Sequence, residues 1–265
     1  MKKMDVTLLI PVALSWLAGL FINYVSDVLP FTRQFSQPVC AHCQAPFSWR
    51  DYLLLRTCPN CGKARSLRTW LVQIVTTTAF VYFWLFPSER LGIPLTMIVL
   101  IYFLIITVID LEHRLILHPT SMAGAVLGLI VGTFIYSKKY TWLGSLGQSL
   151  LGGVIGFGIM FLLYQLGTLV ARYRARRMQA SGQADDEEEA LGGGDVYLAG
   201  VLGLMLGPAI VSALAYGILM GGLVSFLFIL ALLVRRRYTS DALMTFIPYG
   251  PYFILGAFYL LFFIN

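Results

Sequence analysis

The chain has 265 residues, of which 58% are hydrophobic and only 12% charged, and its mean hydropathy is +0.78. A water-soluble domain carries about twice that share of charged residues, so this composition excludes an ordinary soluble globular protein. The net charge of +6 does not indicate nucleic-acid binding, because Lys and Arg in the loops of a membrane protein commonly mark its cytoplasmic side. We therefore expect a lipid bilayer around most of the chain and no nucleic-acid partner.

Long apolar blocks predict eight membrane spans, since a helix needs about 20 residues to cross the hydrocarbon core. In chain order the predicted spans are Val6–Val25, Thr69–Phe86, Pro94–Ile109, Thr120–Tyr136, Leu143–Ala171, Val196–Tyr216, Leu219–Val234 and Leu243–Ile264. The blocks are apolar on all faces, which favours helices over the alternating strands of a barrel. The predicted fold class is an all-α polytopic membrane protein. The break between the sixth and seventh spans rests only on Gly217, Gly221 and Gly222.

Basic residues set the predicted orientation of these spans. Fourteen of the 19 Lys and Arg residues fall in one alternating set of loops, and the other five fall in the opposite set. The positive-inside rule then places the first set in the cytoplasm and both termini outside. The predicted organisation is a first span at 1–29, a cytoplasmic four-cysteine loop at 30–68, and a helical core at 69–265 with a flexible cytoplasmic loop at 172–194.

All four cysteines lie in the first cytoplasmic loop, as Cys40-x-x-Cys43 and Cys58-x-x-Cys61. Two such pairs at this separation are typical of a four-thiolate zinc site, which is closed to substrate and therefore structural. The alternative is a pair of disulfides, which a reducing cytoplasm disfavours. His42 lies between two of the cysteines and could replace one ligand, but a spectator role fits the spacing better.

Two aspartates flank predicted spans. Asp110 follows the third span directly, and Asp195 precedes the sixth after Gly192, Gly193 and Gly194. Two carboxylates that share a site cannot both ionise easily, so one keeps a proton. Such a pair can perform acid–base chemistry on a peptide, because one member takes a proton from water and the other polarises the carbonyl. The alternative for Asp195 is that it only caps the helix that it begins.

Together these segments resemble the type IV prepilin peptidase family. Gly192–Asp195 is similar to its GxGD motif, and Asp110 is similar in position to its first catalytic aspartate. Asn23 lies in a stretch that resembles the end of its first span, and the two cysteine pairs with Trp49 between them resemble its cytoplasmic loop. The last matching stretch, Ile247–Tyr252, resembles its IPFGPF motif and contains Pro248, Gly250 and Pro251.

The resemblance implies an aspartic endopeptidase of the bacterial inner membrane that removes a short basic leader from prepilins or pseudopilins at the cytoplasmic face. Asp110 and Asp195 would be its catalytic residues, and Gly192, Gly194, Asn23, Pro248, Gly250 and Pro251 would support the substrate or the motifs. Many members also methylate the new N-terminus from S-adenosylmethionine. Val28, Gln73 and His118 depart from residues common in the family, and the first two bear on methylation.

Two other functions stay open at this point. One is a GxGD protease of another class that cuts inside a span, which would share the aspartates without the four-cysteine loop. The other is a transporter or scaffold, although the paired broken spans of many transporters are not evident. A run of five acids, Asp185–Glu189, precedes the GxGD motif. It is either a solvated linker or a device that attracts a basic leader.

Overall fold

The computed structural model describes residues 2–40, 43, 45–180, 192–234 and 248–264. Within these residues every element is a helix, apart from one antiparallel bridge between Val39 and Pro46. The predicted all-α class is therefore confirmed. His42 and the acidic run 185–189 lie outside the described residues. The chain divides into two compact units, 1–119 and 120–265, and each is described by itself.

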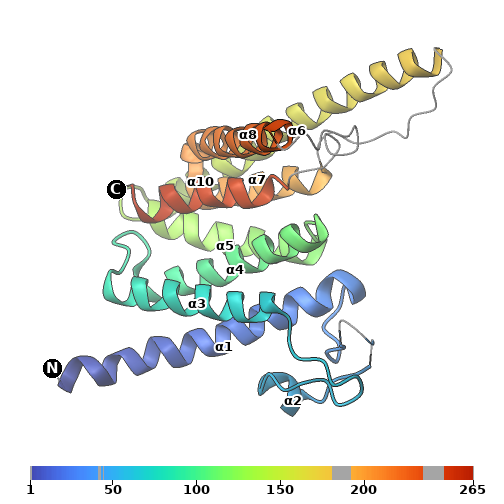
Figure 1. Cartoon of the computed structure of the whole chain (residues 1–265). Coiled ribbons are helices and arrows are strands. Elements are labelled where there is room, and N and C mark those ends of the chain that lie inside the picture. The colour runs from blue at the N-terminus through green and yellow to red at the C-terminus, as the bar shows by residue number, and fades with distance from the viewer. Residues whose placement is uncertain (1, 41–42, 44, 181–191, 235–247, 265) are drawn as a thin grey trace. The chain divides into compact units, whose positions relative to one another are not determined.

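In the described residues of the first unit, three helices are long and one is short. Figure 1 labels them. These are α1 (Lys2–Thr32), α2 (Trp49–Leu53), α3 (Leu67–Leu85) and α4 (Gly92–His113). The three long helices pack on one another around a buried apolar layer. This layer is formed by Ile22, Val25, Leu29, Val72, Ile105, Val108, Ile109 and Leu117. It lies at the end of α4 that carries Asp110, so the packing that holds the three helices together also supports that residue.

The second unit contains α5 (His118–Tyr136, whose first two residues belong to the first unit), α6 (Trp142–Ala180), α7 (Gly193–Leu206), the 3₁₀ turn η1 (Gly207–Ala209), α8 (Ile210–Val234) and α10 (Gly250–Phe262). Helix α7 packs closely on α6, and α8 packs on α10. A β-carbon on Gly203 would clash with the backbone of Gly152, and one on Gly256 would clash with the carbonyl of Ala213. Small residues therefore let these helix backbones touch, as is common in membranes.

Five helical stretches in the described residues are long and apolar enough to cross a membrane: Leu8–Thr32, Gly92–His113, His118–Tyr136, Trp142–Tyr173 and Gly193–Ala231. The predicted second span is a helix, α3, within two residues of its expected bounds, but it is less apolar than these five. Gln73 and the threonines at 76–78 lower its hydropathy. The predicted eighth span is present as the shorter apolar helix α10. Each predicted span thus falls on helical residues, but the sixth and seventh predicted spans share one apolar stretch, Gly193–Ala231.

The predicted break between the sixth and seventh spans was wrong. Helix α8 runs without interruption through Gly217 and Gly221, and the break falls earlier, at Gly207–Ala209. Gly207 has a φ of +60°, and a β-carbon there would clash with the ring of Tyr136. Gly217 and Gly221 instead face α10, where a β-carbon would crowd Phe253 and Tyr249 respectively. These two glycines serve helix packing rather than a turn.

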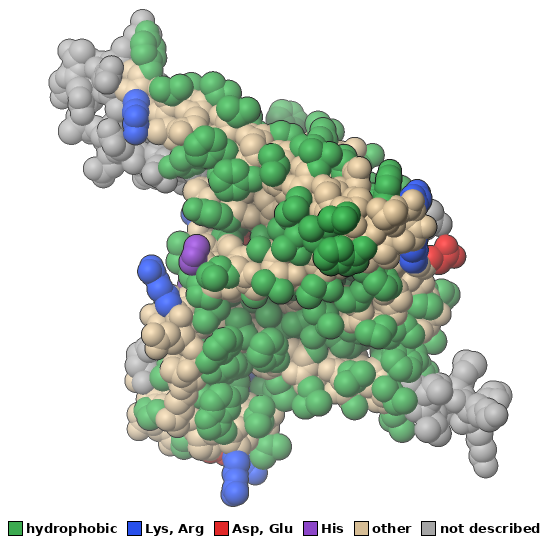
Figure 2. All heavy atoms as spheres, turned by 180° about the vertical axis from the view of Figure 1, so that it is seen from behind, with side chains coloured by type: hydrophobic (Ala, Val, Ile, Leu, Met, Phe, Trp, Pro, Cys, Tyr) green, Lys and Arg blue, Asp and Glu red, His purple; other side chains and the backbone are tan. Residues whose placement is uncertain are grey.

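Two helices are longer than expected. Helix α1 continues seven residues beyond the predicted end of the first span, to Thr32, and tolerates Pro11 and Pro30 inside its length. Helix α6 has 39 residues and ends at Ala180, so residues 172–180, predicted as the start of a loop, are helical. Apolar side chains cover much of the face in Figure 2. Lipid would contact large exposed apolar side chains, of which Leu162 and Phe226 are examples.

Candidate functional site

The four-cysteine loop forms two equivalent knuckles. In the first, the Cys40 N–H donates to the carbonyl of Ala45 at 2.9 Å. In the second, the Cys58 N–H donates to the carbonyl of Lys63 at 3.0 Å. Each first cysteine thus donates to the carbonyl of the residue five positions later. The equal spacing of the two pairs in the sequence is matched by the same backbone hydrogen bond in each.

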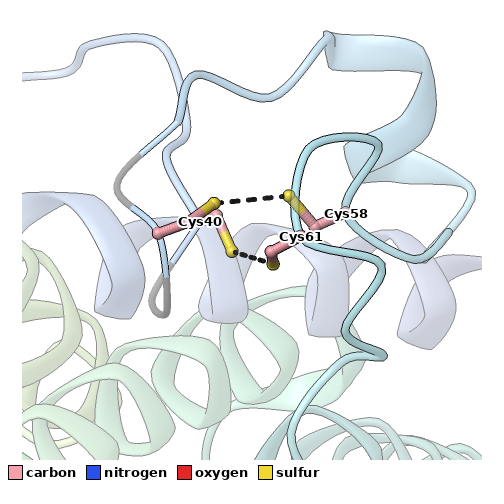
Figure 3. Close-up of side chains that lie close together, drawn as sticks. Cys40, Cys58 and Cys61 are labelled. Carbon is pink, nitrogen blue, oxygen red and sulfur yellow. Dashed lines mark hydrogen bonds between the residues drawn. The ribbon is translucent and has the colours of Figure 1, made fainter.

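The knuckles bring the four thiols together. The Sγ atoms of Cys40 and Cys61 lie 3.8 Å apart, those of Cys43 and Cys58 lie 3.7 Å apart, and all four lie within 4.8 Å of one another. Figure 3 shows the side chains of Cys40, Cys58 and Cys61 turned toward one another from two loop segments. A tetrahedral zinc site with Zn–S bonds of about 2.3 Å has S–S edges of about 3.8 Å. The donor set and its separations therefore fit a metal ion of that kind.

Local hydrogen bonds also affect the acidity of the thiols. A backbone hydrogen bond with Cys61 lowers the pKa of the Cys58 thiol to about 6, although burial opposes it. A backbone hydrogen bond with Lys63 lowers the pKa of Cys61, but desolvation and the neighbouring thiols outweigh it and raise that pKa to about 11. The Cys58 thiol thus loses its proton more readily than the Cys61 thiol. Metal binding requires all four thiols to give up their protons.

The loop has a small core of its own. Phe47 and Tyr52 are almost fully buried and pack with Cys40 and Cys58. The guanidinium carbon of Arg65 lies 3.9 Å from the ring centroid of Tyr52 and 4.6 Å from that of Phe47, as in a cation–π contact. Two of the four buried residues of this core are thiols, so the loop has little apolar packing to hold it without a metal.

Asp110 lies in the last turn of α4 and is only 4% exposed. Its carbonyl accepts a hydrogen bond from the N–H of Arg114, which takes a left-handed conformation and ends the helix. Ile109, in the buried layer described above, precedes it. The predicted position at a span end is confirmed, and the carboxyl group is held where the apolar layer meets the helix terminus.

Asp195 lies in the first turn of α7 and is half-buried. The helix begins at Gly193 with Gly192 as its N-cap, and the Asp195 N–H donates to the Gly192 carbonyl at 3.0 Å. The N-cap is therefore Gly192, and the prediction's alternative that Asp195 is the capping residue is wrong. A carboxylate in a first helical turn is favoured by the helix dipole. Asp110 belongs to the first unit and Asp195 to the second.

The residues predicted to support the motifs occupy helix ends and helix contacts. Asn23 is buried, and its amide donates to the carbonyls of Gly19 and Thr69, which ties α1 to α3. Gly194 lies in the first turn of α7. Pro248 is half-buried ahead of α10, and Gly250 and Pro251 are buried at its start, with the proline in the first turn, where it fits best.

Sequence reasoning missed a set of charged residues near Asp110. The carboxylate of Asp27 on α1 accepts a hydrogen bond from the Tyr52 hydroxyl at 2.5 Å and pairs with Arg68. Arg68 also pairs with Glu112 at 3.0 Å. Burial, followed by the negative charge of Asp27, raises the pKa of Tyr52 far above its usual value, so Tyr52 remains a donor. The signal available in the sequence was that acids are scarce and that Asp27 and Glu112 are among the few near span ends.

Comparison with known proteins adds an independent finding. The sequence model of the type IV leader peptidase family matches residues 97–262, a range that includes both aspartates and excludes the cysteine cluster. No solved structure was found to match the chain.

Curated relatives agree with this match. A protein of Escherichia coli O78:H11 (strain H10407 / ETEC), named type 4 prepilin-like proteins leader peptide-processing enzyme, is 27% identical over 82% of this chain and 72% of its own length. A prepilin leader peptidase/N-methyltransferase of Pectobacterium carotovorum subsp. carotovorum is 27% identical over 82% of this chain and 71% of its own. One of the same name from Myxococcus xanthus (strain DK1622) is 26% identical over 80% and 60%. Because the family match covers more than half of the chain, this multi-pass membrane protein belongs to the type IV leader peptidase family.

Proposed function

We propose that the chain removes the leader peptide from type IV prepilins or pseudopilins, with Asp110 and Asp195 as the catalytic pair. The observation that carries the proposal is that the family match, residues 97–262, contains both aspartates. Their positions support it, since each lies at a helix terminus rather than in mid-span. The membership disfavours a transporter or scaffold, and the cysteine loop disfavours a GxGD protease of another class.

The chemistry needs one ionised and one protonated carboxyl. The ionised member takes a proton from a water molecule, and the oxygen of that water attacks the carbonyl carbon of the leader's last peptide bond. The protonated member donates a hydrogen bond to the carbonyl oxygen, which stabilises the negative charge that develops there. Collapse of the tetrahedral intermediate breaks the C–N bond, and the departing amine receives a proton from the pair. Neither carboxyl is consumed, so the pair returns to its starting state.

Zinc is the metal that the cysteine cluster fits best. Cys40, Cys43, Cys58 and Cys61 would hold it, and four thiolates leave no open position for water or substrate. The ion would supply only structural stabilisation of the loop. The loop would lie on the cytoplasmic side of a bacterial inner membrane, because it belongs to the alternating set of loops that is rich in Lys and Arg.

N-methylation of the product is a second candidate activity, because two of the relatives carry it in their names. The two departures that bear on methylation, Val28 and Gln73, are both 2% exposed. The Gln73 amide lies against Gly19, at a distance that leaves no room for a β-carbon. These neutral, enclosed side chains offer no charged group to S-adenosylmethionine, so the proposal contains no methyl-transfer step.

Co-expression with a candidate prepilin tests both activities. We expect the pilin to lose its leader, as shown by N-terminal sequencing, and its intact mass to show whether a methyl group has been added. An unprocessed prepilin in membranes that contain the folded protein would contradict the peptidase proposal. A processed, methylated pilin would contradict the omission of methyl transfer.

A further inference from the structure

A series of hydrogen-bonded and ion-paired side chains leads from the four-cysteine loop to the last turn of α4. It starts at Tyr52 in the core of the loop, whose hydroxyl donates to Asp27 Oδ2 at 2.5 Å. Asp27 pairs through its other oxygen with Arg68 Nη2, and Arg68 Nη1 lies 3.0 Å from Glu112 Oε2. Glu112 is two residues beyond Asp110. Arg68 is thus one cation that bridges carboxylates on two different helices, α1 and α4.

These pairs are shielded from water more than surface ion pairs are. The side chain of Asp27 is 16% exposed and that of Arg68 is 19% exposed, while Glu112 at 37% is the most open. Arg65 approaches the same Asp27 at 3.8 Å and is 11% exposed. Exposed ion pairs contribute little to stability because water and salt screen them, whereas a shielded network is coupled more strongly.

The loop end of this chain depends on the cysteine knuckles. Tyr52 is 1% exposed, and it packs in the small core with Phe47 and two of the thiols. Arg65 stacks on the same two aromatic rings. A metal that joins both knuckles therefore also fixes the aromatic rings that place the Tyr52 hydroxyl and the Arg65 guanidinium against Asp27.

The other end acts on the turn that contains Asp110. The N–H of Arg114 donates to the Asp110 carbonyl, so Asp110 to Arg114 form the final turn of α4. Final turns fray readily because their carbonyl groups lack partners further along the helix. Arg68 holds Glu112 in the middle of this turn and connects it to α1 and α3. Losing that contact would remove the ion pair that ties this turn to α3, and the turn would keep the ring contact of His113 with Phe31 on α1.

We propose that Asp27, Arg68 and Glu112 are positioning residues that couple metal binding in the four-cysteine loop to the placement of Asp110. The role of Asp110 in this inference rests on the proposed peptidase function, whereas the coupling itself does not. Metal binding fixes Tyr52, Tyr52 and Arg65 hold Asp27, and Asp27 orients Arg68 toward Glu112. Metal loss then loosens the last turn of α4, and with it the placement of Asp110.

Hydrogen exchange measured by mass spectrometry on the full chain in lipid nanodiscs tests the coupling without any substrate. In the parent protein, removal of the metal by a chelator should speed exchange in peptides over residues 106–117 by about tenfold. In Glu112→Gln these peptides should exchange fast at the start and should not respond to the chelator. The matched control is Arg56→Gln, which breaks the exposed pair of Arg56 with Asp51 on the same loop and should keep the parent's response.

Two results would overturn the inference. One is that hydrogen exchange in the α4 peptides of the parent does not change on adding the chelator, and the other is that it rises in Glu112→Gln as much as in the parent. Because Glu112 is the most exposed member, this substitution is the mildest, and Arg68→Gln then checks the bridging cation. With a prepilin that the parent protein cleaves, Glu112→Gln should lower kcat about tenfold and leave KM unchanged. Addition of the chelator should then lower kcat of this variant no further. If the parent cleaves no prepilin, the proposed function fails, while the exchange result still decides the coupling.

Discussion

Asp110 and Asp195 are held in opposite ways by their helices. Asp110 lies in the last turn of α4, next to the buried apolar layer. Asp195 lies in the first turn of α7, whose N-cap is a glycine. Gly192 has extended dihedral angles, and a β-carbon there would make only an ordinary contact, 3.8 Å, with the Asp195 carboxylate oxygen.

We predict that Asp110→Asn and Asp195→Asn each abolish leader removal while the protein stays in the membrane. An amide can neither take a proton from water nor return one, and loss of acid–base catalysis alone costs about 10²–10⁴-fold in rate. The measurement is the processed fraction of a co-expressed prepilin. Asp51→Asn, half-buried in the first turn of α2 in the four-cysteine loop, is the matched control and should process normally. Substantial cleavage by either variant would sink the two-carboxylate mechanism.

Gly207 gives a prediction about stability. Its φ of +60° disfavours any side chain, and the Tyr136 ring occupies the space that a β-carbon would need. The Tyr136 hydroxyl also donates to the carbonyl of Leu206 at 2.8 Å, so displacing the ring breaks a hydrogen bond. Gly207→Ala should lower the free energy of unfolding by about 1–3 kcal/mol. Thermal unfolding in detergent measures this.

The control for that substitution is Gly147→Ala in α6, where a β-carbon would meet nothing within 4 Å. Alanine is favoured over glycine inside a helix by about 0.5–1 kcal/mol, so this variant should be unchanged or slightly more stable. Equal losses in both variants would mean that the turn at Gly207 is not under the constraint described here.

At the scale of elements, the four-cysteine loop has a small core of its own and a donor set that could hold a metal ion. We expect about one zinc ion per chain, and we expect the double substitution Cys40→Ser and Cys43→Ser to remove it, because two thiolates cannot close a tetrahedral site. Elemental analysis checks the metal, and limited proteolysis between residues 38 and 63 checks the loop. Arg56→Gln, which leaves the thiols intact, should retain the metal. A native protein without metal, whose four thiols all react freely, would contradict the prediction.

Elements that depend on residues close together in the chain could be predicted from the sequence. The spacing of the cysteines, the long apolar blocks and the residues at span ends all depend on near neighbours, and the structure has helices or knuckles at each of them. The break at Gly207 was not predicted, because a turn glycine and a packing glycine look alike until the partner helix is known. The pairing of Arg68 with Asp27 and Glu112 joins residues 41 and 44 positions apart, which no local pattern reveals.

At the scale of the whole molecule, charge is distributed unevenly along a mostly apolar chain. The acidic run 185–189 comes shortly before Asp195 in a chain with a net charge of +6. A cluster of like charges attracts opposite charge over about 10 Å at ordinary ionic strength. We therefore propose that this run attracts a basic leader.

We predict that replacing the five acids by Ser and Gln raises KM for a prepilin, flattens its dependence on salt and leaves kcat nearly unchanged. Exchanging Asp for Glu and Glu for Asp within the run keeps the charge and should preserve the parent's kinetics. A processing assay across a salt series measures all three proteins. If the neutral variant matches the parent at every salt concentration, the run is only a linker.

The length of α6 has a consequence for the surrounding lipid. Its apolar part, Trp142–Tyr173, has 32 residues and would extend about 48 Å at 1.5 Å per residue, against a hydrocarbon thickness of about 30 Å. Even a tilt of about 40°, the upper end of the usual range, leaves it longer than that core. The bilayer around this helix must thicken, or part of its apolar surface must enter the headgroup layer. The protein should therefore gain thermal stability as the acyl chains of its bilayer lengthen.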